Sequence, residues 1–202
     1  MPSDAALGAS SRRSFVKQGL GLGLAVTAGG EAMAKALAGY RPRSLTPDEF
    51  AGIRALMARL IPADAASGGA AEAGAHIFLD RALAGFHARH LPTYRAALAE
   101  LGKVDAMPGD ALDALIARME KGELTATKLA DGGRAFFNLL RRHTLEGFLS
   151  DPMYGGNRDF IGWKLIGFHG VQVWFSAENQ QLNGPDDRPQ RSVAEFGGKP
   201  LA

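Results

Sequence analysis

The stretch that decides the fold is FFNLLRRHTLEGFLSDPMYGGNRDFIGWKLIGFHG, residues 136–170. Its first part places apolar side chains at a spacing near 3.6 residues, which predicts a helix from Phe136 to Phe148. Because a residue before proline avoids helical backbone, the pair Asp151-Pro152 predicts that this helix ends there. The rest of the chain is interpreted outward from this helix and its end.

The second half of the stretch holds a glycine-rich loop and then a dense apolar segment. In the loop, Gly155 and Gly156 permit positive φ or a close approach of two backbones. The segment from Asp159 to Gly170 then supplies Phe160, Ile161, Trp163, Leu165, Ile166 and Phe168. That much apolar and aromatic surface must be buried, either inside this domain or against a partner.

Helical patterns also fill the chain before this stretch. Thr46-Pro47-Asp48-Glu49 predicts a helix start, because threonine caps the helix and Glu49 completes a capping box. The apolar stripe of this helix runs to Pro62. Further helices are expected over residues 76–90, 91–101 and 108–122, and a last one that begins within residues 124–129, breaks or kinks at Gly132-Gly133 and ends at Phe148.

No strand pair is predicted, because the best β-like run, residues 171–175, is short. The sequence therefore predicts a mostly α-helical single domain over residues 46–175. Residues 39–45 form a basic, proline-containing linker before it, and residues 176–202 are polar with several prolines. A segment of that composition cannot build a core alone, so we expect an extended, partner-binding tail with Val193 and Phe196 as its anchors.

Residues 1–38 resemble an export signal. The run SRRSFVK at residues 11–17 fits the twin-arginine pattern S-R-R-x-F-L-K with valine for leucine, so Arg12, Arg13 and Phe15 are the expected recognition residues. The apolar run that follows is too short to span a bilayer, and small residues suited to cleavage come after it. Two other interpretations stay open: a helix whose arginine pair has no role, and a signal retained as a membrane anchor.

Composition and charge exclude several classes of protein. The net charge is +2, and residues 1–38 account for all of it with four basic and two acidic residues. The remaining chain is neutral and has no basic footprint for nucleic acid. The chain has no cysteine, which excludes disulfides, thiolate nucleophiles and cysteine-ligated metal or iron–sulfur centres.

Candidate residues for chemistry lie in the quoted stretch: His143, Asp151, Tyr154, Asn157 and His169. His143 and Asp151 could form an acid–base pair. However, no nucleophile motif, GxGxxG fingerprint, P-loop or haem-attachment motif accompanies them. We therefore predict no catalytic and no cofactor-binding residue, and interpret the Tyr154–Asn157 loop chiefly as turn architecture or partner contact.

Three histidines, His76, His87 and His90, raise the question of a metal site. His87 and His90 lie three residues apart on the expected helix, but no HExxH pattern and no carboxylate at ligand spacing accompanies them. We therefore interpret all three as surface or capping residues and predict no metal site.

The order of the motifs in the quoted stretch resembles the gluconate 2-dehydrogenase subunit 3 family. The likeness is carried by Thr144-x-x-Gly147, Asp151-Pro152-x-Tyr154-Gly155-Gly156-Asn157, Gly162-Trp163 and Ile166-Gly167-Phe168. It extends more loosely back to about Leu45 and shows little beyond Gly170. Members of this family are small subunits of membrane-bound, flavin-dependent sugar and polyol dehydrogenases.

The resemblance implies a periplasmic complex, peripheral on the cytoplasmic membrane. Its large subunit would bear FAD and oxidise a sugar or sugar acid, and a multihaem cytochrome c subunit would pass the electrons to quinone. This chain would bind no cofactor, would stabilise the large subunit and would supply the signal that the twin-arginine translocon reads. Its expected partner-facing residues are Tyr154, Gly155, Gly156, Asn157, Trp163, Phe168, Val193 and Phe196.

The sequence leaves two other classes of function open. One is a stand-alone helical periplasmic enzyme that uses His143 and Asp151, and turnover by the isolated chain would favour it. The other is a self-associating structural protein, which a homo-oligomer without any flavoprotein partner would favour.

Overall fold

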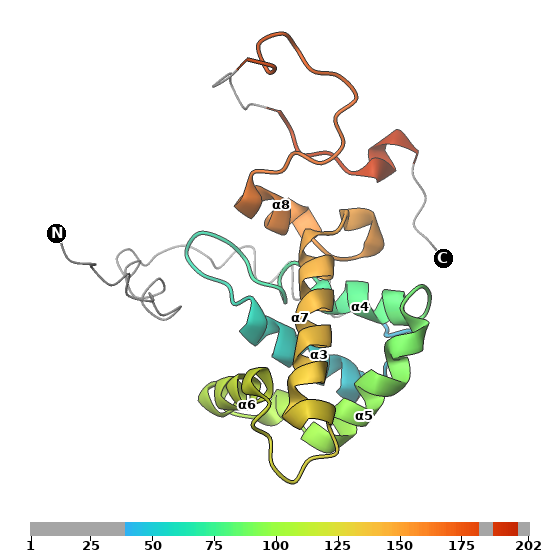
Figure 1. Ribbon diagram of the computed structural model, residues 1–202. Coiled ribbons are helices and arrows are strands. Elements are labelled where there is room, and N and C mark those ends of the chain that lie inside the picture. The colour runs from blue at the N-terminus through green and yellow to red at the C-terminus, as the bar shows by residue number, and fades with distance from the viewer. Residues whose placement is uncertain (1–38, 182–187, 198–202) are drawn as a thin grey trace, which may run out of the picture. The chain divides into compact units, whose positions relative to one another are not determined.

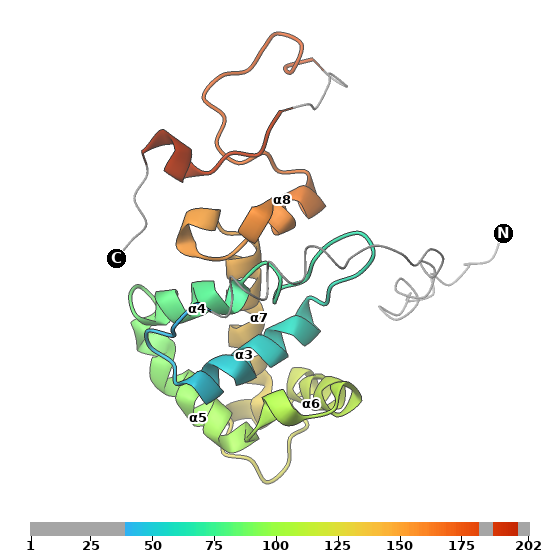
Figure 2. The same cartoon turned by 180° about the vertical axis from the view of Figure 1, so that it is seen from behind.

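The computed structural model describes residues 39–181 and 188–197 (Figures 1 and 2). The predicted signal, residues 1–38 with Arg12, Arg13 and Phe15, lies outside the described residues, as does part of the predicted tail. None of the described helices is long and apolar enough to cross a bilayer.

Over these residues the chain is helical without strands, as the sequence predicts. Six α-helices occur: α3 (Pro47–Leu60), α4 (Ala75–Leu83), α5 (Leu91–Leu101), α6 (Gly109–Lys121), α7 (Arg134–Leu149) and α8 (Ile161–Ile166). Short 3-10 turns lie between or after them: Ala88–His90, Val104–Ala106, Ala130–Gly133, Pro152–Tyr154, Arg158–Phe160 and Val193–Phe196.

Several helix ends follow the local chemistry of the sequence. At the start of α3, the Thr46 hydroxyl accepts a hydrogen bond from the Glu49 amide (3.2 Å), and the Glu49 carboxylate accepts one from the Thr46 amide (2.8 Å). This confirms the predicted capping box. α7 ends at Leu149, just before Asp151-Pro152, as predicted.

Two helices are shorter than the sequence predicts. The helix expected over residues 76–90 ends at Leu83, where the chain turns and the His87 amide donates to the Ala82 carbonyl (2.8 Å). α7 begins only at Arg134, because Asp131 (φ 52°) and Gly132 (φ 59°) take the left-handed conformation. A right-handed helix cannot run through such residues, so the expected start within residues 124–129 is wrong.

Helix α7 is the central element of the helical part. It contacts α3, α4, α5 and α6, and both views show these helices around it (Figures 1 and 2). Buried side chains from all five helices share one core, among them Ile53, Leu56, Leu79, Tyr94, Met119, Phe136 and Leu140. α4 and α7 cross closely, since a Cβ atom at Gly147 would lie 2.9 Å from the Cα atom of Ala75. Only glycine permits this crossing.

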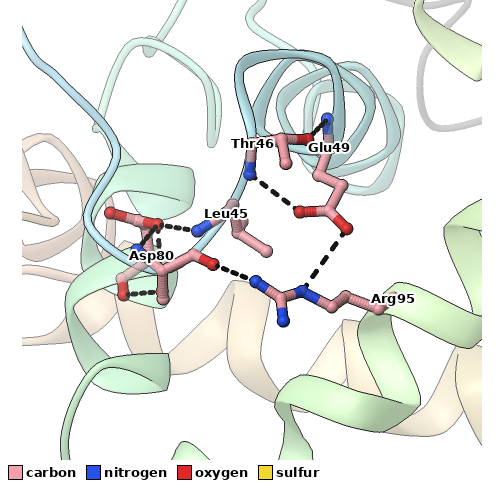
Figure 3. A network of polar contacts seen from close by, with 6 residues as sticks. Leu45, Thr46, Glu49, Asp80 and Arg95 are labelled. Atoms are coloured by element: carbon pink, nitrogen blue, oxygen red, sulfur yellow. Dashed lines mark hydrogen bonds and ion pairs between the residues drawn. The ribbon is translucent and has the colours of Figure 1, made fainter.

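A buried carboxylate on α4, Asp80, holds the segment that precedes α3 (Figure 3). Its Oδ2 atom accepts hydrogen bonds from the Tyr40 hydroxyl and the Arg43 amide, both at 2.7 Å. Its Oδ1 atom accepts from the amides of Ser44 (3.0 Å) and Leu45 (2.9 Å). The Ser44 hydroxyl also donates to the main-chain carbonyl of Asp80 (2.6 Å).

These bonds correct the expectation that residues 39–45 are a linker. The segment is an ordered strap between α4 and α3, and Arg95 of α5 adds a hydrogen bond to the Ser44 carbonyl (2.9 Å) and an ion pair with Glu49 (3.6 Å) (Figure 3). Burial by itself would raise the pKa of Asp80. The hydrogen bonds outweigh burial and hold that pKa below its ordinary value.

We predict that Asp80→Asn lowers the free energy of unfolding by roughly 3 kcal/mol, because an amide NH₂ group would face amide and hydroxyl donors in a buried site. The depressed pKa means that the stability from the ionised carboxylate is complete at neutral pH and is lost as the pH falls below about 4. The decrease in the free energy of unfolding caused by Asp80→Asn, measured by urea unfolding, should therefore be large at pH 7 and become smaller in acid.

Asp113→Asn is the matched control. Asp113 lies on α6 and pairs with Arg59 near the surface, so its replacement should cost less than about 1 kcal/mol. Equal effects of the two substitutions would show that the strap contributes no more than a surface ion pair.

Candidate functional site

The loop that follows α7 is organised by the buried side chain of Asn157. Its Nδ2 atom donates to the Ser150 carbonyl (2.9 Å), and its Oδ1 atom accepts from the Gly162 amide (2.8 Å). The backbone of Asn157 is left-handed (φ 43°), which asparagine tolerates better than most residues. One amide side chain thus joins the end of α7 to the start of α8.

Gly156 and Gly162 let the loop pack against α7. A Cβ atom at Gly156 would lie 2.0 Å from the Gly147 carbonyl oxygen, and one at Gly162 would lie 2.0 Å from the Phe148 carbonyl oxygen. Any larger residue would clash with backbone at these two places. The glycines and the asparagine of this motif are therefore architectural in this chain.

Trp163 of α8 is also interior, with 5% of its surface exposed. Its indole N–H donates to the Leu149 carbonyl (2.7 Å), and its ring packs against those of Phe160 and Phe168. Among the predicted partner-facing residues, Gly156, Asn157 and Trp163 are thus buried within the chain itself. Tyr154 and Gly155 are half-buried, and Phe168, Val193 and Phe196 are exposed.

Asp151 anchors the described part of the predicted tail. Its carboxylate accepts hydrogen bonds from the Ser192 hydroxyl (2.5 Å) and the Val193 amide (2.8 Å). Residues 188–197 are therefore not simply extended, because they turn back and end in a capped 3-10 turn. The His143 ring bonds instead to the Tyr94 hydroxyl (2.9 Å), so the hydrogen bonds of the two residues do not join them as an acid–base pair.

Eight large apolar side chains in the C-terminal part of the described chain are exposed, and we call this set of residues the C-terminal apolar surface. It comprises Leu165, Ile166, Phe168, Val173, Trp174, Phe175, Val193 and Phe196. Trp174 is 73% exposed and Val173 is 70% exposed. The β-like run at residues 171–175 forms no strand. An isolated β-bridge pairs Gly170 with Arg191, and the Gln172 side chain donates to the Pro189 carbonyl (3.2 Å). The segment lies beyond α8 in both views (Figures 1 and 2).

A groove of about 1030 Å³ lies beside α7, and its wall is mostly apolar. Its lining includes Phe78, Phe86, Leu145, Leu149, Asp151 and Tyr154. Of the predicted partner-facing residues, Tyr154 therefore lines this groove and does not belong to the C-terminal apolar surface.

His76 differs from its predicted surface or capping role, whereas His87 and His90 are partly exposed and His90 precedes the first residue of α5. His76 is fully buried against Phe50, and neither ring nitrogen has a hydrogen-bond partner. Burial, with help from nearby arginines, lowers the pKa of His76 to about 3. His87 and His90 meet the buried ring of His143 from α7, a contact between residues far apart in the sequence. His169 contacts the Arg188 carbonyl (2.7 Å).

Comparison with known protein families finds a match over most of the helical part. A family model described as gluconate 2-dehydrogenase subunit 3 matches residues 47–170, more than half of the chain. The matched range begins at the first residue of α3 and ends at Gly170, which agrees with the resemblance inferred from the sequence. No curated protein and no solved structure gives a match.

We predict that Trp163→Ala lowers the free energy of unfolding of the purified chain by roughly 3–5 kcal/mol, because it empties a buried site and removes the bond to the Leu149 carbonyl. Trp174→Ala is the matched control, since Trp174 is exposed and its loss should change stability by less than about 0.5 kcal/mol. Thermal and urea unfolding measure both. An unchanged melting temperature in Trp163→Ala would contradict the interior position of this ring.

Proposed function

Because the chain belongs to the gluconate 2-dehydrogenase subunit 3 family and is thus a small subunit of a dehydrogenase complex, we propose that its own role is non-catalytic. It binds the large subunit of the complex, stabilises it and supports its maturation and export. The observation that carries this proposal is the C-terminal apolar surface, which this chain alone leaves exposed.

An exposed surface of this kind is typical of a binding site. Trp174 and Phe168 are exposed, and aromatic residues of this kind are common anchors of protein interfaces. The tail is held in place by Asp151, which binds Ser192 and the backbone of Val193. This anchoring orders Val193 and Phe196 before binding, which reduces the entropy lost on association.

The redox chemistry of the complex then belongs to the partner subunits. We propose FAD in the large subunit, where the sugar or sugar acid is oxidised, and haem c in a cytochrome subunit that passes electrons to quinone. Side chains such as those of this chain cannot carry electrons between such partners without a cofactor. The two alternatives, an enzyme built on His143 and Asp151 and a self-associating structural protein, predict turnover or homo-oligomers from the chain alone.

Export is the second part of the proposed role. The SRRSFVK run supports a twin-arginine signal, and that route carries folded proteins. A large subunit that has bound its flavin in the cytoplasm could cross the membrane together with this chain. The complex would then lie in the periplasm, peripheral on the cytoplasmic membrane.

We predict that Trp174→Ser weakens binding of the large subunit by about 2 kcal/mol or more while leaving the melting temperature of this chain unchanged. Co-purification and titration of the separated subunits measure the effect. Leu145→Ser is the matched control, because Leu145 is also an exposed apolar residue (44%) but lies in the groove. Normal binding by Trp174→Ser would remove the C-terminal apolar surface from the interface.

The export role gives a separate prediction. Replacing Arg12 and Arg13 together by lysine should retain both this chain and the large subunit in the cytoplasm, because the pair is the feature that the translocon recognises. Cell fractionation followed by immunodetection of each subunit measures the distribution. Arrival of the large subunit in the periplasm without this chain would show that it is exported independently.

A further inference from the structure

Three histidines from two separate parts of the chain converge beside the groove. His87 follows α4, His90 ends the next 3-10 turn, and His143 lies on α7. One ring nitrogen of each lies within 4.8 Å of the other two. The rings of His87 and His143 stack with centroids 4.2 Å apart, and His90 meets His143 edge-on at 5.3 Å.

The buried member of the cluster has an unused nitrogen. His143 is fully buried, its Nδ1 atom bonds to the Tyr94 hydroxyl (2.9 Å), and its Nε2 atom has no hydrogen-bond partner. An orphaned polar atom in a protein interior costs free energy unless it meets a ligand. If Nδ1 carries the proton and donates it to the Tyr94 oxygen, Nε2 presents a lone pair, which is the form that binds a metal ion.

The surroundings supply a second oriented imidazole and a negative charge. Glu146, one turn after His143 on α7, contacts Nε2 of His87 at 2.7 Å. A carboxylate bound to one ring nitrogen orients the ring and leaves the other nitrogen for a metal.

Two positively charged side chains, those of Arg142 and Arg89, also lie near the cluster. The Nε atom of Arg142 lies 4.0 Å from a carboxylate oxygen of Glu146, and this ion pair offsets the positive charge of Arg142. Arg89 donates to Nε2 of His90 (3.2 Å), but it is exposed and can move into solvent. Neither arginine therefore closes the cluster to a cation.

We propose that His87, His90 and His143 form a binding site for a divalent transition-metal ion of the zinc type. Three imidazole ligands with an open fourth position are a common zinc arrangement, and the fourth ligand here is water. His87 and Glu146 both line the groove, so the cluster borders the groove on this side. This site is independent of the proposed role in the dehydrogenase complex.

Metal binding requires a modest closure of the cluster. Zinc–nitrogen bonds are about 2.0–2.1 Å long, so ligand nitrogens around one ion lie closer together than the present limit of 4.8 Å. His87 and His90 are only half-buried and lie in turns rather than in a long helix. They can move toward His143, which α7 holds in place, and the bound ion would tie this turn to α7.

The test is calorimetric titration of Zn²⁺ into the purified full chain, prepared without a polyhistidine tag and stripped with a chelator. We expect one equivalent to bind and the melting temperature to rise. His90→Gln should weaken binding at least tenfold, and His87→Gln should do the same if His90→Gln fails to fold. The matched control is His169→Gln. His169 lies outside the cluster, so the chain with this substitution should bind zinc as the wild-type chain does.

Tyr94→Phe tests the outer shell of the site. This substitution removes the hydroxyl that bonds Nδ1 of His143 but keeps the aromatic ring in the core. Loss of such an outer-shell partner weakens metal binding by about 10–100-fold. Co²⁺ in place of zinc should give the visible absorption of a four-coordinate ion in the wild-type chain and not in His90→Gln. The proposal is overturned if the wild-type chain binds no stoichiometric zinc, or if His90→Gln and His87→Gln bind it as tightly as His169→Gln does.

Discussion

The buried carboxylate of Asp80 is the interaction on which the N-terminal half of the helical part depends. A carboxylate in the interior is tolerated only when its oxygens are fully bonded, and here main-chain amides and one phenol supply those bonds. Because the donors come from the strap before α3, satisfying the charge also determines where α3 begins (Figure 3). Arg95 then connects this point to α5. One charge thus joins three helices that the sequence separates.

A second constraint of the same kind acts at the other end of α7. The amide of Asn157 joins Ser150 to Gly162, and the glycines around it allow backbone to lie on backbone. Together they set the direction in which α8 leaves the helical part. The buried ring of Trp163 holds α8 against the end of α7, and the side chains on the other face of α8 remain in solvent. The exposure of Leu165 and Ile166 on α8 is therefore a consequence of how the loop is built.

This arrangement fits a subunit that acts through binding. The family motif serves largely internal architecture, while the large apolar side chains with the highest exposed fractions, Val173 and Trp174, lie beyond the matched range that ends at Gly170. Asp151 belongs to both regions, since it follows α7 and also holds Ser192 of the tail. Asp151 thus links the family motif to the tail that carries Val193, although the two are far apart in the sequence.

The sequence by itself determined the features that depend on near neighbours. The capping box of Thr46 and Glu49, the helix stop at Asp151-Pro152, the helical class and the family all follow from residues a few positions apart. Only the tertiary structure decided which residues far apart meet. Asp80 binds a strap 35 to 40 residues away, and His143 of α7 meets His87 from the turn after α4. Trp163 and Phe168 are both large aromatic residues in the sequence, yet one is buried and the other is exposed, because burial depends on what the folded chain packs against each ring.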